Sequence, residues 1–468
     1  MNSTSKAPFG SWHSSESHRL CLLICLHIAV LCLTLILVAR YDRFAGSDPH
    51  VAHLFYPPAF HIFFDADRLH VVVPVIAVFA CLSGLFVTAR FSFGFFAGFY
   101  FYTMIFGYLW LNSFSDLSYN HGLARLSAMA SLITFLLPAL FVSSPLHQRF
   151  VLSTRAFDRM LMLIFLVGVV VVVLGAAYNF RLVALADIYQ FRDQISAPKI
   201  VNYLVTIVST VLLPFAFAGF LARKAYWWAV AVLLVLPFLY PVTLSKTAFF
   251  TPIWLVAMLL VSRLFEARVA VILSLFVPMF AGVMLFLTLG SKAGFFFHTI
   301  ELRQITIPAL AMDIYNDFFS RHDLTYFCQI SFLKPIMRCP YQEQLSVLLE
   351  GQYGLGNYNA SLFATEGIAS VGPLWAPVVT FACGLVFALG NRLSSGLPPE
   401  FILISGAILP QILLNVPLST TLLSHGMGLI FLLWYLTPRA ISESDRSNAA
   451  LRLDAQASQA GAEAVSES

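Results

Sequence analysis

The chain is a succession of apolar runs that are long enough to cross a membrane as helices. Hydrophobic residues make up 59% of its 468 residues and charged residues only 11%, which excludes a water-soluble globular protein. A helix needs about 20 predominantly apolar residues to span the hydrocarbon core. We expect about 12 transmembrane helices in an all-α polytopic membrane protein, at residues 20–38, 71–89, 91–111, 126–142, 160–177, 200–221, 226–244, 248–262, 269–289, 371–390, 401–416 and 420–436.

Two of these runs are short and contain proline, Pro252 in 248–262 and Pro410 in 401–416. Because proline removes a helix hydrogen bond, either span is expected to be tilted, broken or re-entrant. The first run, 20–38, is too long for a typical signal peptide core and has no small-residue cleavage site after it. We interpret it as a first span.

Basic residues predict the orientation. With the N-terminus in the cytoplasm, twelve Lys and Arg residues fall inside and eight in the short outer loops, in the sense of the positive-inside rule. The expected organisation is a cytoplasmic N-terminus (1–19), nine spans (20–289), a large outer loop (290–370), three spans (371–436) and a disordered cytoplasmic tail (437–468).

The polar loop 290–370 contains an amphipathic pattern. Residues spaced by three and four form one apolar face: Ile307, Leu310, Ile314 and Phe318. Another face carries Asp313, Asp317 and Arg321 at steps of four, where carboxylates pair with arginine. We predict a helix lying in or near the membrane interface.

The loop also holds Cys328 and Cys339, which form either a disulfide in an oxidising compartment or two free thiols. No CxxC or Cys/His spacing predicts a metal site.

Two further groups are candidates for binding or chemistry. Lys246, flanked by Ser245 and Thr247 between two spans, either contacts a phosphate or is an interface anchor that reaches water. Asn357, Asn359 and Glu366 precede the expected tenth span. A carboxylate so close to the membrane is costly, and is therefore expected to be functional or paired.

A family resemblance rests on these two groups. The stretch 359–372, with its Asn-Ala start, its Glu-Gly pair and Gly372 at the next span, resembles the signature of bacterial O-antigen polymerases and related oligosaccharide repeat-unit polymerases. The stretch 245–247 resembles the Ser-Arg element of the wider superfamily, which includes the O-antigen ligases. About twelve spans with one large loop before the last three are similar to that family's topology.

The sequence departs from the family pattern at three points. Lys246 stands where an arginine is usual, which keeps the charge but loses the bidentate fork. Tyr358 stands before Asn359 where ligases and some polymerases carry histidine. The arginine-to-glycine spacing of some polymerases is absent when read from Arg303, Arg321 or Arg338.

The resemblance implies a glycosyltransferase of the integral-membrane GT-C type that uses no metal or other cofactor and binds no nucleic acid. It implies undecaprenyl-diphosphate-linked glycans as donor and acceptor, on the periplasmic side of the bacterial inner membrane, and allows a chain-length regulator as a protein partner. The product would be O-antigen, capsule or exopolysaccharide.

Residue roles follow from that chemistry. A leaving diphosphate gains negative charge, which Lys246, Arg303 and Arg321 are placed to stabilise. The attacking hydroxyl needs a general base, for which the candidates are Glu366 and His322. We favour Glu366 because it lies in the better-matched motif. Asn357 and Asn359 are expected to orient sugar hydroxyls.

Other functional classes fit less well. An O-antigen ligase shares donor and fold, but the missing histidine before Asn359 counts against it. A lipid-linked oligosaccharide flippase or a transporter should carry charges within its spans and two similar halves, and the sequence displays neither. A purely anchoring membrane protein is the remaining alternative.

The orientation can be tested by labelling. Because loop 290–370 is expected outside, a cysteine introduced at Gln342 should react with a membrane-impermeant thiol reagent in intact cells. Labelling that occurs only after lysis would overturn the orientation.

Overall fold

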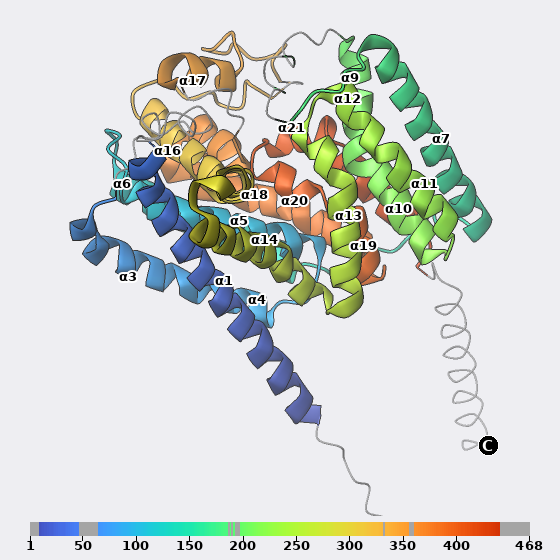
Figure 1. Cartoon of the computed structure of the whole chain (residues 1–468), viewed down its shortest axis with the longest axis horizontal. Helices are drawn as coiled ribbons and strands as arrows, with labels where there is room; N and C mark the ends of the chain where they lie inside the picture. Colours follow the sequence, from blue (N-terminus) through green and yellow to red (C-terminus); the bar gives the residue numbers. More distant parts are fainter. Residues whose placement is uncertain are drawn as a thin grey trace, which may run out of the picture. The chain divides into compact units, whose positions relative to one another are not determined.

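The structure is a computed structural model that describes residues 9–45, 64–185, 188, 191, 197–330, 333–354 and 360–439 (Figure 1). Over these residues the secondary structure is helical, with no β-strand. Ten helices in this part of the chain are long and apolar enough to cross a membrane, and they match the first ten expected spans: Ser17–Val38, Ala66–Thr88, Phe93–Asn112, His121–Phe141, Thr154–Tyr178, Lys199–Ala222, Tyr226–Thr243, Lys246–Leu264, Ala267–Leu289 and Phe363–Ser394.

The last two expected spans are not continuous helices. Residues 401–416 form α19 (Pro399–Ser405) and α20 (Leu409–Leu413), and residues 420–436 form α21 (Leu418–Leu423) and α22 (Met427–Leu436). The break, at residues 406–408, comes directly before α20, whose second residue is Pro410. The second break lies at Gly426, which has a φ of +79°. A left-handed residue ends a helix, and glycine adopts that conformation at little cost.

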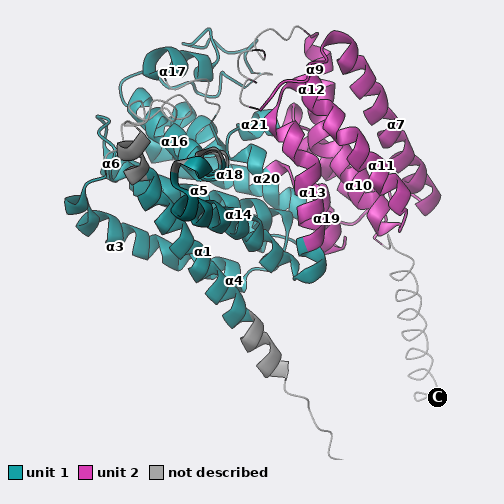
Figure 2. Ribbon diagram, in the orientation of Figure 1, with its two compact units in different colours: residues 1–143, 261–391, 410–421 teal, residues 144–260, 392–409, 422–468 magenta. Residues whose placement is uncertain are grey.

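The chain forms two compact units, each assembled from segments far apart in sequence (Figure 2). Unit 1 contains residues 1–143, 261–391 and 410–421, and unit 2 contains residues 144–260, 392–409 and 422–468. The candidate residues between 290 and 370 belong to unit 1, whereas Lys246 belongs to unit 2.

Unit 1 is built around α5 (Phe93–Asn112), every residue of which is buried. Its first turn is capped by Ser92, whose Oγ accepts a hydrogen bond from the Phe95 amide at 3.1 Å. The helix packs against α1 (Phe9–Ala45), α3 (Leu69–Ala80), α6 (His121–Phe141), α14 (Ala267–Leu289) and α16 (Ile307–Phe319). A span with no lipid-facing side serves as the core of its unit.

An aromatic cluster joins α5 to three other segments. Phe101 of α5 has its ring centroid 5.2 Å from that of Phe135 in α6 and 5.1 Å from that of Phe363 in η8 (Phe363–Ala369). Phe387 of α18 (Ser370–Ser394) lies 5.0 Å from Phe135. These edge-to-face contacts fix η8, which carries Glu366, against the core of unit 1.

Close backbone approach strengthens the same junction. A Cβ atom at Gly94 would lie 2.1 Å from the carbonyl oxygen of Ala139, so only glycine fits there. Asn391 bridges the two helices: its Oδ1 accepts from the Gly94 amide and its Nδ2 donates to the Ala139 carbonyl, both at 2.7 Å. Small residues and amide bridges of this kind hold membrane helices together.

The predicted interfacial helix is instead a buried one. The helix α16 spans Ile307–Phe319 and all its residues are buried within unit 1, so it does not rest with one face exposed as the amphipathic pattern suggested. The reason is that its remaining positions are mostly small or apolar, and that Asp313 and Asp317 both find hydrogen-bond donors inside the protein. It follows a nine-residue π-helix, η7 (His298–Thr306).

The rest of the polar segment covers this end of unit 1. Cys328 and Cys339 form a disulfide, which decides between the two alternatives. Within that loop, the Gln329 amide donates to the carbonyls of Tyr341 and Glu343 at 3.3 and 3.2 Å. The short helix α17 (Leu345–Tyr353) follows. The remaining elements of unit 1 are η2 (Ala66–Arg68), η3 (Cys81–Ser83), α4 (Gly84–Thr88), η6 (Gly290–Ala293) and α15 (Gly294–Phe297).

Unit 2 is centred on α10 (Leu213–Ala222), which packs against α7 (Thr154–Tyr178), α11 (Tyr226–Val235) and α19. Its other elements are α9 (Lys199–Ile207), the π-helix η4 (Val208–Leu212), η5 (Leu236–Phe238), α12 (Leu239–Thr243), most of α13 (Lys246–Leu264) and α22. Trp434 of α22 donates to Ser405 Oγ of α19 at 2.9 Å, which links the two broken spans.

Gly372 provides a test of the fold at the start of α18. It has φ +77° and ψ 167° within α18, and its nearest neighbour, Leu324, leaves room for a methyl group at 3.7 Å. Gly372→Ala should therefore destabilise the protein through backbone strain alone, by about 1–3 kcal/mol, seen as a lower thermal unfolding midpoint in detergent. The matched control is Gly351→Ala in α17, where no atom lies within 4 Å. Equal midpoints for both variants would contradict the strain.

Candidate functional site

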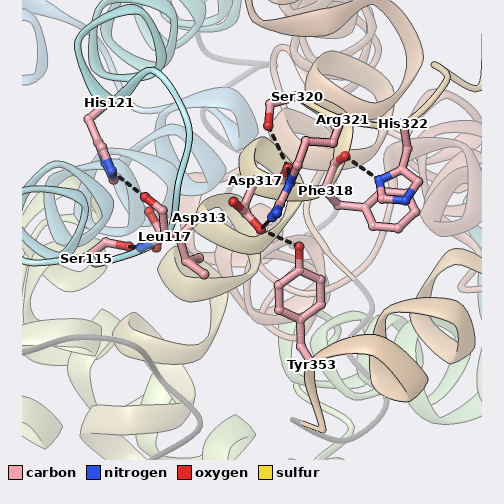
Figure 3. Close-up of polar contacts among 10 residues, drawn as sticks. All are labelled: Ser115, Leu117, His121, Asp313, Asp317, Phe318, Ser320, Arg321, His322 and Tyr353. Atoms are coloured by element: carbon pink, nitrogen blue, oxygen red, sulfur yellow. Dashed lines mark hydrogen bonds and ion pairs between the residues drawn. The ribbon is translucent and has the colours of Figure 1, made fainter.

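The C-terminal end of α16 carries an arginine held by a buried carboxylate (Figure 3). Arg321 Nη2 is paired with Asp317 Oδ2, as the spacing of four predicted, and the Tyr353 hydroxyl donates to the same oxygen at 2.6 Å. The Arg321 side chain is 53% exposed and that of Asp317 only 1%. The buried acid fixes the orientation of a guanidinium group that still offers donors to the outside.

Tyr353 acts as a neutral donor in this cluster. Its own burial and the hydrogen bond to the Asp317 carboxylate raise the pKa of the Tyr353 hydroxyl above its usual value. The Tyr353 hydroxyl therefore keeps its proton and donates a hydrogen bond to Asp317 Oδ2. Asp317 Oδ1 is buried and has no hydrogen-bond partner among the described residues.

His322, the next residue, is exposed and has a defined ring orientation. Its ring stacks on that of Phe318, with centroids 4.0 Å apart and an interplanar angle of 5°. Its Nδ1 lies 2.9 Å from the Phe318 carbonyl oxygen, and a carbonyl can only accept, so Nδ1 carries the proton. In the neutral imidazole the lone pair is then on Nε2, which is the form that a general base requires.

The loop after α16 is attached to the segment 360–372. The amides of Thr325 and Tyr326 donate to the carbonyls of Ala369 and Ser370 at 2.8 and 3.2 Å. These carbonyls lie at the junction of η8 and α18, directly before the Gly372 kink. The end of α16 that carries Arg321 and His322 is therefore next to the segment 360–372, although some forty residues separate them in sequence.

Glu366 lies in η8 and is only 6% exposed. Its Oε1 accepts from both the amide and the hydroxyl of Ser419, each at 2.9 Å, and so stabilises the first turn of α21. Its Oε2 is buried without a partner in the described part of the chain. One oxygen of this carboxylate thus has a structural use that its position in the sequence did not indicate.

The other predicted site residues are less closely defined. Asn357 and Asn359 lie outside the described residues, as does the side chain of Arg303, whose backbone belongs to η7. Lys246 is the first residue of α13 in unit 2 and is partly buried.

Two buried carboxyl groups were missed by sequence reasoning. Asp313 was expected on a charged helix face beside Arg321, but it is buried and accepts hydrogen bonds from Ser115 Oγ at 2.5 Å and from the Tyr119 hydroxyl. Burial raises its pKa. No sequence signal linked it to Ser115, because the two residues are 198 positions apart.

Glu301 is the second missed group. It is fully buried, with Oε2 accepting from Thr34 Oγ1 at 3.2 Å. A Cβ atom at Gly282 would lie 2.4 Å from its Oε1, so this glycine provides the space for the carboxyl group. Burial raises the pKa of Glu301 to about 8. Its place in a segment expected to be an outer loop concealed its burial.

Comparisons with protein-family models, with curated proteins and with solved structures find no match to this chain. Over the described residues, no three His, Cys, Asp or Glu side chains gather to form a candidate metal site.

Glu301 gives a pH dependence that can be measured. Between pH 4.5, its ordinary pKa, and about 8, its pKa in the folded protein, only the unfolded chain loses this proton. Stability should therefore fall as pH rises through this window, by up to about 1.4 kcal/mol per pH unit. Glu301→Gln should flatten that part of the profile of unfolding midpoint against pH, whereas Glu343→Gln, at an exposed glutamate, should not. An unchanged slope in Glu301→Gln would refute the assignment.

Proposed function

We propose that this protein is an integral-membrane glycosyltransferase that polymerises undecaprenyl-diphosphate-linked oligosaccharide repeat units on the periplasmic side of the bacterial inner membrane. The observation that carries the proposal is the pairing at the end of α16: an anchored, half-exposed Arg321 beside His322, whose Nε2 is available as a base. The attachment of this end to the segment 360–372, which carries most of the resemblance to repeat-unit polymerases, supports it.

The reaction is a displacement at a sugar carbon. A hydroxyl at the non-reducing end of the acceptor repeat unit attacks the anomeric carbon of the donor glycan, and the bond from that carbon to the donor's diphosphate oxygen breaks. The hydroxyl proton passes to His322 Nε2. The departing polyprenyl diphosphate carries the negative charge, which Arg321 stabilises. Arg303 and Lys246 remain candidates for the same task, and Asn357 and Asn359 for orienting hydroxyls.

This proposal gives the base role to His322 rather than to Glu366. His322 is exposed and has a free ring nitrogen, whereas Glu366 is buried and uses Oε1 to hold Ser419. We therefore assign Glu366 a positioning role, because it connects η8 to α21. The ring of Tyr341 packs against buried Phe318 beside the base, and an aromatic side chain at this place suits stacking of a sugar ring.

An O-antigen ligase would use the same donor and the same chemistry. It differs in its acceptor, the lipid A core. The polymerase is preferred because Tyr358 occupies the position at which ligases carry histidine.

Substitution of the base and the cation tests the proposal in cells. His322→Ala and Arg321→Ala should each reduce long-chain polysaccharide by about 100-fold or more and leave lipid carriers capped with single repeat units, at unchanged protein levels. The measure is the ladder of polymer lengths on a gel. The matched control is Arg338→Ala, which removes an exposed arginine from the same segment. A normal ladder from His322→Ala would rule out the histidine as base.

The variant Glu366→Gln distinguishes a positioning role of Glu366 from a role as general base. The amide oxygen of glutamine can still accept from Ser419, so a positioning role predicts a ladder reduced by less than about ten-fold. Complete loss of polymer in a protein with a normal unfolding midpoint would instead identify Glu366 as the base.

A further inference from the structure

Two further arginines of unit 1, Arg68 and Arg125, contact the same serine, Ser113. Arg68, at the end of η2, donates through Nη1 to the carbonyl oxygens of Ser113 and Ser115, both at 3.3 Å. Arg125, in α6, donates through Nη1 to Ser113 Oγ at 3.4 Å. Two guanidinium groups from different helices thus contact a single serine.

The positive charge of this pair is poorly neutralised within the protein. Arg68 Nε lies 3.6 Å from Asp65 Oδ2, and both side chains are about half exposed (47% and 49%). Arg125 has no acidic group within ion-pair distance among the described residues, and its Nε donates to the His121 carbonyl at 3.3 Å. Two guanidinium groups that contact one serine can both donate to a single anion, which favours binding of that anion.

The loop that holds the pair is fixed by several contacts to its neighbours. Ser115 accepts from Arg68 through its carbonyl and donates through Oγ to the buried Asp313 of α16 (Figure 3). Asn112 Nδ2 donates to the Tyr119 hydroxyl at 2.6 Å, and the ring centroid of Tyr119 is 4.2 Å from that of His121. The donors are therefore positioned before any ligand binds, which lowers the cost of binding.

The pair also lies at the ends of candidate membrane spans. Arg68 is in the first turn of the span Ala66–Thr88, Arg125 is near the start of His121–Phe141, and Ser113 directly follows Phe93–Asn112. Span ends lie in the headgroup region, where the phosphates of lipids are found.

We propose that Arg68 and Arg125 form a binding site for the diphosphate group of a polyprenyl-linked glycan, separate from the site at Arg321. This inference rests on the proposed function, whose reaction requires two lipid diphosphates at once. The donor's diphosphate leaves from the reacting carbon and belongs beside Arg321 and His322. The acceptor reacts at its non-reducing end, so its diphosphate lies one repeat unit away from the reacting atoms. Arg68 and Arg125 are assigned to that second diphosphate.

The arrangement of α16 fits two neighbouring sites. Asp313 supports the loop of Arg68 and Arg125 through Ser115, and Asp317, one helical turn later, supports Arg321. One buried helix therefore positions both arginine sites.

The test is a binding measurement on the purified full-length protein in phosphatidylcholine nanodiscs. The probe is undecaprenyl diphosphate, and the number of bound molecules is counted by native mass spectrometry over a concentration series. We expect two saturable sites in the unmodified protein. The double variant Arg68→Gln/Arg125→Gln should weaken one of them at least ten-fold, and Arg321→Ala should weaken the other. The matched control is Arg90→Gln, at an exposed arginine beyond the opposite end of the span Ala66–Thr88, which should leave both affinities unchanged.

Competing lipids identify the source of the phosphate. If phosphatidylglycerol displaces the probe from this site as effectively as unlabelled undecaprenyl diphosphate does, the arginines are headgroup anchors and the proposal is wrong. Unchanged binding in the double variant would also overturn it. Should the double variant fail to fold, Ser113→Ala, which removes the contact to Arg125 and keeps both charges, should weaken the same site about three-fold. An unaltered affinity in that variant would count against the proposal.

The two proposals can fail separately. Loss of one site in the double variant, in a protein that makes no polymer, would support the diphosphate site and reject the polymerase. Normal binding at two sites by the double variant, in a protein that makes polymer, would reject the Arg68–Arg125 site alone.

Discussion

The burial of two carboxyl groups on one helix is the interaction on which unit 1 depends. A carboxylate taken out of water costs several kcal/mol unless donors surround it. Asp313 accepts hydrogen bonds from Ser115 and Tyr119. Asp317 pairs with Arg321 and accepts a hydrogen bond from Tyr353. These donors come from the loop before α6, from the end of α16 and from α17. The hydrogen bonds to these two carboxyl groups therefore connect α16 with the loop before α6 and with α17.

The same burial positions two arginines of unit 1. Arg321 is held from beneath by Asp317, and Arg68 is held through Ser115 by Asp313. In both cases the acid is inside and the guanidinium reaches outward. Such an arrangement fixes the guanidinium group but leaves some of its N–H donors unused. An arginine held in this way is better suited to bind a phosphate group than an arginine in an exposed surface ion pair.

Packing behind α16 supplies the mechanical support. The wholly buried α5, the ring cluster of Phe101, Phe135, Phe363 and Phe387, and the bridge from Asn391 to Gly94 join α6, α18 and η8 to one core. Glu366 adds a polar link from η8 to α21 through Ser419. The π-helical form of η8 and η7 accords with the frequent occurrence of such segments at functional sites.

The membrane class and ten of the spans could be predicted from the amino-acid sequence, because hydrophobic length is a local property of the chain. The sequence also predicted the contact between Asp317 and Arg321, since a spacing of four places two side chains on one helix face. It could not determine that α16 is buried, that Glu366 holds α21, or that Arg68 and Arg125 meet at Ser113. Each of these depends on partners that are distant in sequence, such as Ser115 for Asp313 and Ser419 for Glu366. Only the tertiary structure decides which donors reach a buried acid, because that requires the packing of the whole unit.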